Sequence, residues 1–451
     1  MNVNLWNINI LGVGFMLIFS AFNAASFMES IVFKDYAKHG ITIETGFHSL
    51  AVIYGVLGLS NWFAPAIVNK LGSKLSLILS VIPNICFIFS MYEPYQWSIY
   101  LCSALLGTGG GILWTANGEV IAKNSPGDTK PRNTGIFWSW FNMSALVGNT
   151  FLYFQLGNSE TISDDTRHTI YLVLGGFSVA GLLSFVLLKP NETPLDECEI
   201  DEQSAWQPIK DGMRFAVSPN MGLLYGAFIF TGLSLNFWSS VYIVIIGNVF
   251  PKRNYLALAG ICVGIGQVSS GFVWSVLTYK IGRKGVLMCT TLVYCIALTL
   301  VYLAFPSDAA TTAEVRAQGV PIIASNIYLS LFIALLIGLG DGGFNVTIYA
   351  TLGQLWEETP APAFAVFKFV QGMLATVAFL YCGVLLLPYQ LLILALTCVI
   401  GSFCFLILDY KCARQAEYEE LPDRRDLDRR DVSGNNQFYE ELEQPLLQGD
   451  G

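Results

Sequence analysis

Long apolar runs recur along the 451-residue chain, and they constrain its fold more than any other feature of the sequence. Each run is long enough to cross a bilayer as a helix, which takes about 20 apolar residues. Strands of a membrane barrel would instead give short alternating segments. Only 13% of the residues are charged, too few to cover a soluble protein of this length. We therefore predict an all-α integral membrane protein with twelve transmembrane helices, at residues 5–28, 47–68, 75–92, 97–121, 134–156, 168–188, 219–247, 256–279, 285–305, 325–351, 361–386 and 388–409.

A polar, acidic stretch divides these spans six and six. We predict an N-terminal six-helix half at 1–188, a cytosolic acidic linker at 189–217, a C-terminal six-helix half at 218–409 and a disordered cytosolic tail at 410–451. The linker and the tail carry the net charge of −9, so the membrane body is neutral. Lys and Arg are more frequent in the loops on the side of the termini, and this bias places both termini in the cytosol.

Short sequences recur six predicted helices apart and in the same orientation. Leu106–Ile112 in the fourth span resembles Ile337–Gly343 in the tenth. Leu71–Lys74 after the second span resembles Ile281–Lys284 after the eighth. Two parallel six-helix halves are the arrangement of major facilitator transporters. The sequence therefore predicts a major facilitator fold.

The loop after the eighth span, Lys280-Ile-Gly-Arg-Lys284, resembles the basic half of the major facilitator loop signature. Tyr279 stands where that signature has an acidic residue. The resemblance implies a conformational latch between the halves, formed by Lys280, Gly282, Arg283 and Lys284.

Further segments resemble the Unc-93-like branch of that superfamily, and the likeness extends over residues 5–409. They are Leu11–Met16, Ile53–Val56, Arg132–Trp138, Gly338–Asp341 and Ala361–Gln371. The resemblance implies a twelve-helix facilitator fold. It leaves the function open, because some relatives in this branch are accessory subunits or trafficking chaperones of other membrane proteins.

An ionisable residue at the centre of a membrane-spanning helix raises the free energy of insertion by about 2.5–3.5 kcal/mol. Each one inside a predicted span therefore calls for a structural or functional explanation. Asp341, near the middle of the tenth span, is either a proton- or cation-coupling carboxylate or a buried acid that ties helices together. Lys368, roughly 9 Å into the eleventh span, either faces Asp341 across a substrate or reaches to the interface. Glu119 is an alternative partner for Lys368. Asn345 and Gln371 either line a cavity or join helices.

The polar tail contains patterns of the kind that sorting adaptors bind as extended peptides. Two have the form Tyr-x-x-Leu and one is a dileucine; the residues are Tyr418, Leu421, Tyr439, Leu442, Leu446 and Leu447. They predict an endosomal or lysosomal location, with the plasma membrane as the alternative.

The sequence contains no nucleophile–base signature, no phosphate-binding glycine loop and no metal-ligand spacing, so we expect no enzymatic activity, no cofactor, no bound metal and no nucleic-acid partner. Two functions remain open. One is a secondary transporter that moves a small solute by alternating access, with or without proton or cation coupling. The other is a non-transporting Unc-93-type accessory or trafficking subunit. The expected partners are the lipid bilayer, an unknown small solute, another membrane protein and sorting adaptors.

Overall fold

The computed structural model describes residues 3–36, 38–126, 129–190, 207–311, 320–356 and 360–420. Throughout these ranges the regular elements are helices. The chain divides into two units, Met1–Cys404 and Phe405–Gly451. Both predicted halves lie in the first unit, except for the last residues of the predicted twelfth span.

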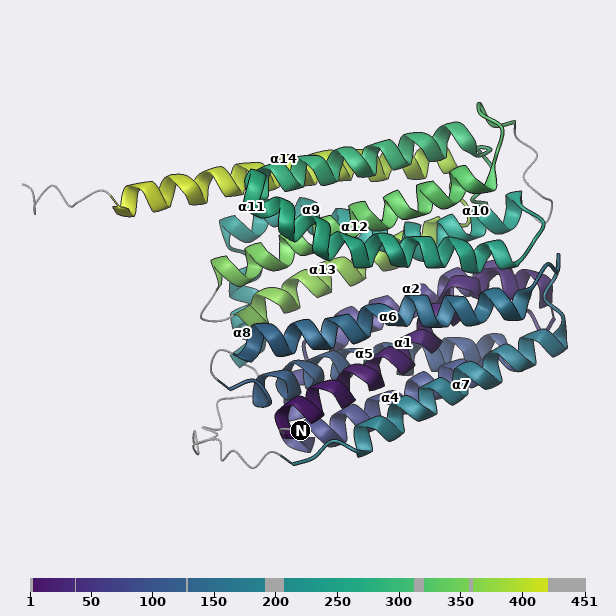
Figure 1. Ribbon diagram of the computed structural model, residues 1–451, viewed down its shortest axis with the longest axis horizontal. Helices are drawn as coiled ribbons and strands as arrows, with labels where there is room; N and C mark the ends of the chain where they lie inside the picture. Colours follow the sequence, from purple (N-terminus) through teal and green to yellow (C-terminus); the bar gives the residue numbers. More distant parts are fainter. Residues whose placement is uncertain are drawn as a thin grey trace, which may run out of the picture. The chain divides into compact units, whose positions relative to one another are not determined.

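The N-terminal half is a bundle around one long helix. Its helices are α1 (Val3–Tyr36), α2 (Ile43–Ser60), α3 (Ala64–Leu71), α4 (Ser73–Ser90), α5 (Gln96–Lys123), α6 (Lys130–Leu156) and α7 (Asp164–Val186). α1 packs against α6 and α7, while α4 packs against α5 and α7 (Figure 1). Phe15 of α1 is fully buried and meets the rings of Trp114 and Phe137 edge-on. The core of this half is therefore aromatic at its centre.

The C-terminal half follows a short helix in the linker, α8 (Gln207–Ala216). Its helices are α9 (Pro219–Asn236), the π-helical turn η2 (Phe237–Val241), α10 (Tyr242–Val249), α11 (Asn254–Ala304), α12 (Ile327–Leu355), α13 (Pro360–Tyr381) and α14 (Leu387–Glu420). α9, η2 and α10 follow one another without a break and form one span, Pro219–Val249. α12 packs along α11, and α13 packs against α9.

The predicted latch loop is a reversal inside α11. Two spans, Asn254–Thr278 and Lys280–Ala304, meet at Gly282, which has φ 69° and ψ 173°. Gly72 separates α3 from α4 at the corresponding place in the other half, with φ 79° and ψ 152°. Only glycine populates this backbone region readily. The same glycine-dependent turn thus marks the same place in each half.

Eleven helices of the described residues are long and apolar enough to cross a membrane, and they coincide with eleven of the predicted spans. The predicted span 134–156 is a helix, α6, but its apolarity is lower, so the count of twelve is not confirmed. Some polar residues of α6 face other helices: Asn149 is fully buried, and Trp140 Nε1 donates to Asn9 Oδ1 at 3.0 Å. α6 can be less apolar because α1 and α11 cover it.

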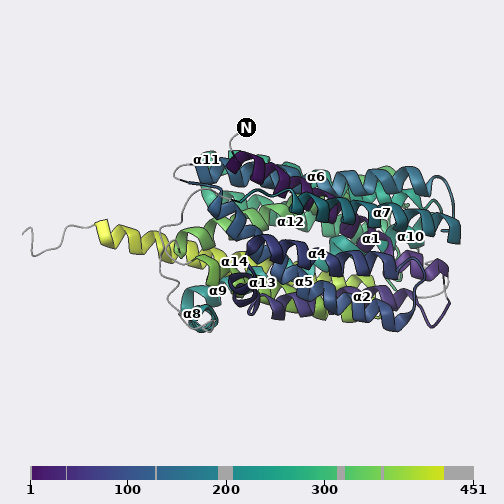
Figure 2. The same ribbon diagram turned by 90° about the horizontal axis from the view of Figure 1, so that it is seen from below.

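The two halves meet along two helix pairs, α2 with α13 and α6 with α11 (Figures 1 and 2). Glycines permit the close approach in both. A Cβ on Gly372 would lie 2.9 Å from the Tyr54 carbonyl oxygen, and one on Gly260 would lie 2.7 Å from Asn149 Oδ1. The halves therefore approach backbone to backbone between α2 and α13, and backbone to side chain between α6 and α11.

Two predicted segments are described only in part. The linker is described up to residue 190 and from α8 onward, and residues 191–206 lie outside the described residues. α14 continues to Glu420, past the predicted end of the last span at 409. Of the predicted sorting residues, Tyr418 falls on α14, and Leu421, Tyr439, Leu442, Leu446 and Leu447 lie outside the described residues. The predicted domain boundaries stay predictions.

Candidate functional site

The glycine run around Asp341 lets α12 lie unusually close to both segments of α11. A Cβ on Gly338 would collide with the Val263 carbonyl oxygen, and one on Gly340 would lie 2.8 Å from the Tyr294 ring. Small residues of this kind allow membrane helices to approach backbone to backbone. The glycine run therefore brings the centre of α12, which carries Asp341, into close contact with α11.

Asp341 is the central residue of the 29-residue α12, and it is 5% exposed. Its carboxylate accepts hydrogen bonds from Ser234 Oγ at 2.6 Å, Asn345 Nδ2 at 3.2 Å and Gln267 Nε2 at 3.5 Å. These donors come from α9, α12 and the first segment of α11. A buried carboxylate needs such donors, because it can only accept.

A second hydroxyl extends this network. Tyr294, fully buried on the second segment of α11, shares a 2.9 Å hydrogen bond with Ser234 Oγ. Ser234 has one hydrogen, which it gives to Asp341 when the carboxylate is ionised. When Asp341 carries a proton, that proton can bond to Ser234 Oγ while Ser234 donates to Tyr294. The site thus accommodates the ionised and the protonated acid with its hydrogen bonds made.

A polar face of α12 continues from Asp341 through Asn345 to Tyr349, at intervals of four residues. Lys368 of α13 places its Nζ 5.4 Å from the centre of the Tyr349 ring, and it donates to Gln371 Oε1 at 2.8 Å. No hydrogen bond or ion pair of the described residues joins Lys368 to Asp341 directly. Four of the predicted site residues, Asp341, Asn345, Lys368 and Gln371, thus lie along one polar track in the C-terminal half.

The fifth predicted residue lies elsewhere. Glu119, on α5, forms an ion pair with Lys123 one turn further along the same helix. The structure therefore gives Glu119 a local partner and does not bring it to Lys368. In the predicted latch loop, Arg283 Nη1 donates to Gln354 Oε1 at the end of α12. That contact stays within the C-terminal half.

The track reaches the interface between the halves at Tyr349. Trp138 of α6 lies edge-on to the Tyr349 ring, with ring centres 6.5 Å apart. Sequence reasoning missed Tyr349, whose only signal is its spacing of four and eight residues from Asn345 and Asp341.

Sequence reasoning also missed a buried acid in the N-terminal half. Glu29 of α1 is fully buried, and Ser49 Oγ of α2 donates to its Oε1. The predicted first span ended at residue 28, whereas α1 runs to Tyr36. The apolar residues Ile31–Phe33 after Glu29 were the signal that the span continues past the acid.

A third group of charges lies where α1 ends and α2 begins. We call this the distal end of the bundle; the start of α1 lies at the other. Arg253, just before α11, donates to Asp35 of α1 through Nη2 at 2.8 Å and Nε at 3.1 Å. Both side chains are about nine-tenths buried, at 10% and 8% exposed. This bidentate pair ties the two halves together at the distal end.

A surface cluster at the same end links α7 to the loop after α4. Arg167 is 2% exposed, and its Nη2 lies 3.5 Å from Glu93 Oε1. His168 Nε2 lies 2.8 Å from the same oxygen. The hydrogen bond with His168 holds the pKa of the Glu93 carboxyl below its usual value. Buried Arg167 thus connects to titratable groups at the surface.

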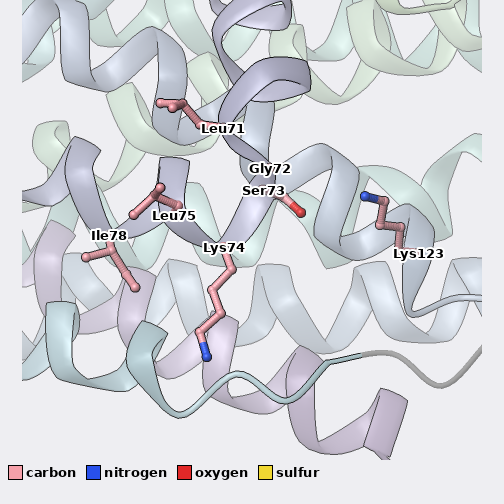
Figure 3. Close-up of a pocket in the computed structure, with 7 residues that line it drawn as sticks. All are labelled: Leu71, Gly72, Ser73, Lys74, Leu75, Ile78 and Lys123. Carbon is pink, nitrogen blue, oxygen red and sulfur yellow. The ribbon is translucent and has the colours of Figure 1, made fainter. Parts of the chain in front are cut away.

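An open hollow of about 480 Å³ lies at the turn between α3 and α4 (Figure 3). It is lined by Leu71, Gly72, Ser73, Lys74, Leu75, Ile78 and Lys123. Lys74 Nζ donates to the Leu188 carbonyl at 2.7 Å. The hollow belongs to the glycine turn of the N-terminal half and contains none of the predicted site residues.

These features define a multi-pass, all-helical membrane protein with a buried, hydrogen-bonded acid at the centre of its second half. Its fold is that of transporters of known structure. A POT family transporter in complex with 5-aminolevulinic acid is similar with a TM-score of 0.67 at 12% identity, covering 90% of this chain and 96% of that chain. The nucleoside transporter NupG is similar with a TM-score of 0.63 at 13% identity, covering 90% and 99%.

Sequence comparison identifies the family. The family model described as "Ion channel regulatory protein UNC-93" matches residues 37–406. The UNC93-like protein MFSD11 of Xenopus tropicalis is 34% identical over 444 residues, covering 92% of this chain and 98% of that protein. Protein unc-93 homolog A of Homo sapiens is 22% identical over 440 residues, covering 87% and 91%. The chain belongs to the UNC-93 family, as its sequence motifs predicted.

Proposed function

We propose that this protein is a secondary transporter of a small solute, with Asp341 as its coupling carboxylate. The observation that carries the proposal is the buried acid at the centre of α12, held by donors from three helices. Ionisable residues at such a depth are rare and mark substrate or ion pathways. The track from Asp341 through Asn345 and Tyr349 offers a solute hydrogen-bonding groups and the charge of Lys368.

The same hydrogen bonds suit Asp341 for proton coupling. Ser234 and Tyr294 can exchange donor and acceptor roles as the acid gains or loses a proton. A proton or a cation bound at Asp341 would change the charge that faces the solute. Uphill transport would then draw on the gradient of that ion.

Alternating access would occur between the two halves along α2–α13 and α6–α11. At the distal end the Asp35–Arg253 pair joins the halves, so transport requires this pair to break and re-form in each cycle. With both termini in the cytosol, as the loop charges predict, the distal end faces away from the cytosol. The described state is then closed on that side.

The test is a thermal-shift screen of the purified protein against metabolites, at roughly pH 5 and roughly pH 8. A ligand that binds only the folded state stabilises it by about 2.7 kcal/mol at a hundredfold excess over its Kd. We expect a hit that Asp341→Asn abolishes, followed by ion-dependent uptake of that hit into liposomes. Asp165→Asn is the matched control, because that carboxylate is exposed at the distal end and forms no ion pair among the described residues. A hit that binds and is taken up equally well by Asp341→Asn would remove Asp341 from the mechanism.

The second candidate is a non-transporting accessory or trafficking subunit for another membrane protein. The description of the family model, an ion channel regulatory protein, favours it. A defined membrane protein would then co-purify in fixed stoichiometry and lose surface abundance when this chain is depleted. Adaptor binding through the tail, and with it an endosomal or lysosomal rather than plasma-membrane location, is tested by Tyr418→Ala in the full chain. Neither candidate function is enzymatic.

A further inference from the structure

A buried acid in the N-terminal half has the surroundings of a second ion-binding site. Glu29 has an exposed fraction of zero, and its Oε2 has no hydrogen-bond partner among the described residues. No lysine, arginine or histidine of the described residues forms an ion pair with it. An ionised Glu29 would therefore be a buried charge without a counter-charge, which is strongly unfavourable inside a membrane protein. A bound proton removes that cost.

The hydrogen bonds around Ser49 support both states of the acid. Ser49 Oγ approaches Glu29 Oε1, and it also lies 2.9 Å from the Gly46 carbonyl oxygen. Its single hydrogen can go to an ionised Glu29. When Glu29 is protonated, the acid can donate to Ser49 Oγ while Ser49 donates to the Gly46 carbonyl. Ser49 can therefore switch partners without losing a hydrogen bond.

Tyr171 of α7 is the buried hydroxyl that we assign to the step between this acid and the distal surface. It is fully buried, its hydroxyl has no hydrogen-bond partner among the described residues, and its helix packs along α1, which carries Glu29. Arg167 in turn contacts His168 and Glu93 at the surface. A buried hydroxyl without a partner is rare and calls for an explanation. A relay role would explain it: the hydroxyl passes its proton to Glu29 and regains one from the surface side in the same step.

Glu29, Tyr171 and Ser49 lie at similar depths below the distal end. Glu29 stands seven residues before the end of α1 at Tyr36, and Tyr171 stands seven residues after the start of α7 at Asp164. At 1.5 Å per residue each lies roughly 10 Å from the distal end. Ser49 lies at a similar depth in α2, roughly 9 Å. Three helices thus place one acid and two hydroxyls in a single layer beneath the surface cluster.

We propose that Glu29 is a proton-binding site, loaded through Tyr171 from His168 and Glu93 at the distal surface, the titratable groups that Arg167 contacts. The facing group from α2 is Ser49. The described residues of α6, α10 and α11 provide no ion pair or hydrogen bond to Glu29. The site is separate from Asp341, which lies in the other half. It does not depend on solute transport, so each can be tested without the other.

Infrared spectroscopy of the purified protein in lipid nanodiscs tests this directly, through the carbonyl stretch of protonated carboxyl groups. We expect a band that titrates with pH, is absent from Glu29→Gln and persists in Asp341→Asn. Loss of the band in Asp341→Asn alone, with Glu29→Gln unchanged, would assign the proton to the other acid and overturn the proposal. Displacement of the Glu29 band by Na⁺ at constant pH would overturn it in favour of a cation site.

The route is tested by Tyr171→Phe, which removes only an unpartnered hydroxyl and should leave the fold intact. We expect the Glu29 band to remain, and its shift after transfer to D₂O to slow by roughly a hundredfold, as for the loss of a proton-transfer group. Tyr54→Phe, a partly buried phenol stacked on Phe379 at the α2–α13 interface, is the control and should exchange like the wild type. Equal exchange rates in Tyr171→Phe and the wild type would refute the route.

Discussion

The ion pair between Asp35 and Arg253 allows the contact between the halves to be measured as an energy. Arg253 binds the carboxylate with two nitrogens and gives a third bond, from Nη1, to the Gly247 carbonyl at 3.0 Å. Asp35 Oδ2 also accepts from the Ile162 backbone nitrogen at 3.0 Å. Asp35→Asn keeps the size of the side chain and removes its charge. It leaves the Arg253 guanidinium buried without a counter-charge.

Breaking a buried pair by removing one partner destabilises a protein by about 3–5 kcal/mol. The slight exposure of both side chains and the remaining bond to Gly247 place Asp35→Asn at the lower end, about 3 kcal/mol. Arg253→Gln should cost less, because Asp35 keeps its bond from Ile162. The double variant leaves no uncompensated charge. Its cost should therefore fall short of the sum of the single costs by about 2 kcal/mol.

The measurement is a double-mutant cycle from unfolding curves of the purified variants in one detergent. Lys38→Gln is the control, because Lys38 pairs with Asp164 at the same end of the molecule while both side chains are more than half exposed. Such an exposed pair contributes less than about 1 kcal/mol. If Asp35→Asn costs no more than Lys38→Gln, or if the single costs simply add, the pair does not hold the halves together.

Two further predictions concern stability. Tyr171 and Tyr242 are both fully buried, but only Tyr242 bonds its hydroxyl to a backbone carbonyl, at 2.6 Å. Tyr242→Phe should therefore lower the free energy of unfolding by about 1–3 kcal/mol, whereas Tyr171→Phe should leave the unfolding temperature unchanged or raise it. Equal losses of stability in the two variants would refute this distinction. Gly282→Ala should cost about 1–3 kcal/mol through backbone strain alone, since nothing lies within 4 Å of the added Cβ. Gly353→Ala, a helical glycine with equally open surroundings, should stabilise by up to about 1 kcal/mol, and a loss as large as that of Gly282→Ala would show that strain is not the cause.

Most of the fold could be predicted from hydropathy, because a bilayer requires each crossing segment to be apolar and helical. α6 shows where that reasoning stops: a helix covered by others can carry buried Asn149 and so fall short of the apolarity of a lipid-facing span. The turn at Gly282 was predictable from the repeat, since the same glycine stands at position 72.

Sequence analysis identified a residue of the candidate site only where that residue type is rare in a membrane span. Asp341 stands out as an acid in an apolar run, but Ser234 and Tyr294 are ordinary residues in a membrane helix. They come from helices far apart in the sequence, and only packing shows that they meet. Lys368 was predicted roughly 9 Å into its span, short of the mid-membrane depth of Asp341, and the structure places Asn345 and Tyr349 between them along one helix face.

The two buried acids differ in depth, and this assigns them different proposed roles. Asp341, at the centre of α12, is about 21 Å from either end of its helix, so a change in access between the halves can expose it to one side or the other. Glu29 lies roughly 10 Å from the distal end, at the same depth as Tyr171, and the proposed route through Tyr171 leads toward that end only. Acidity on the distal side would then act on Glu29 in every state of the protein, whereas its effect on Asp341 would depend on which side is open. A proton bound at Glu29 next to the α1 segment that carries Asp35 is therefore placed to influence closure, and a proton bound at Asp341 is placed to be carried across.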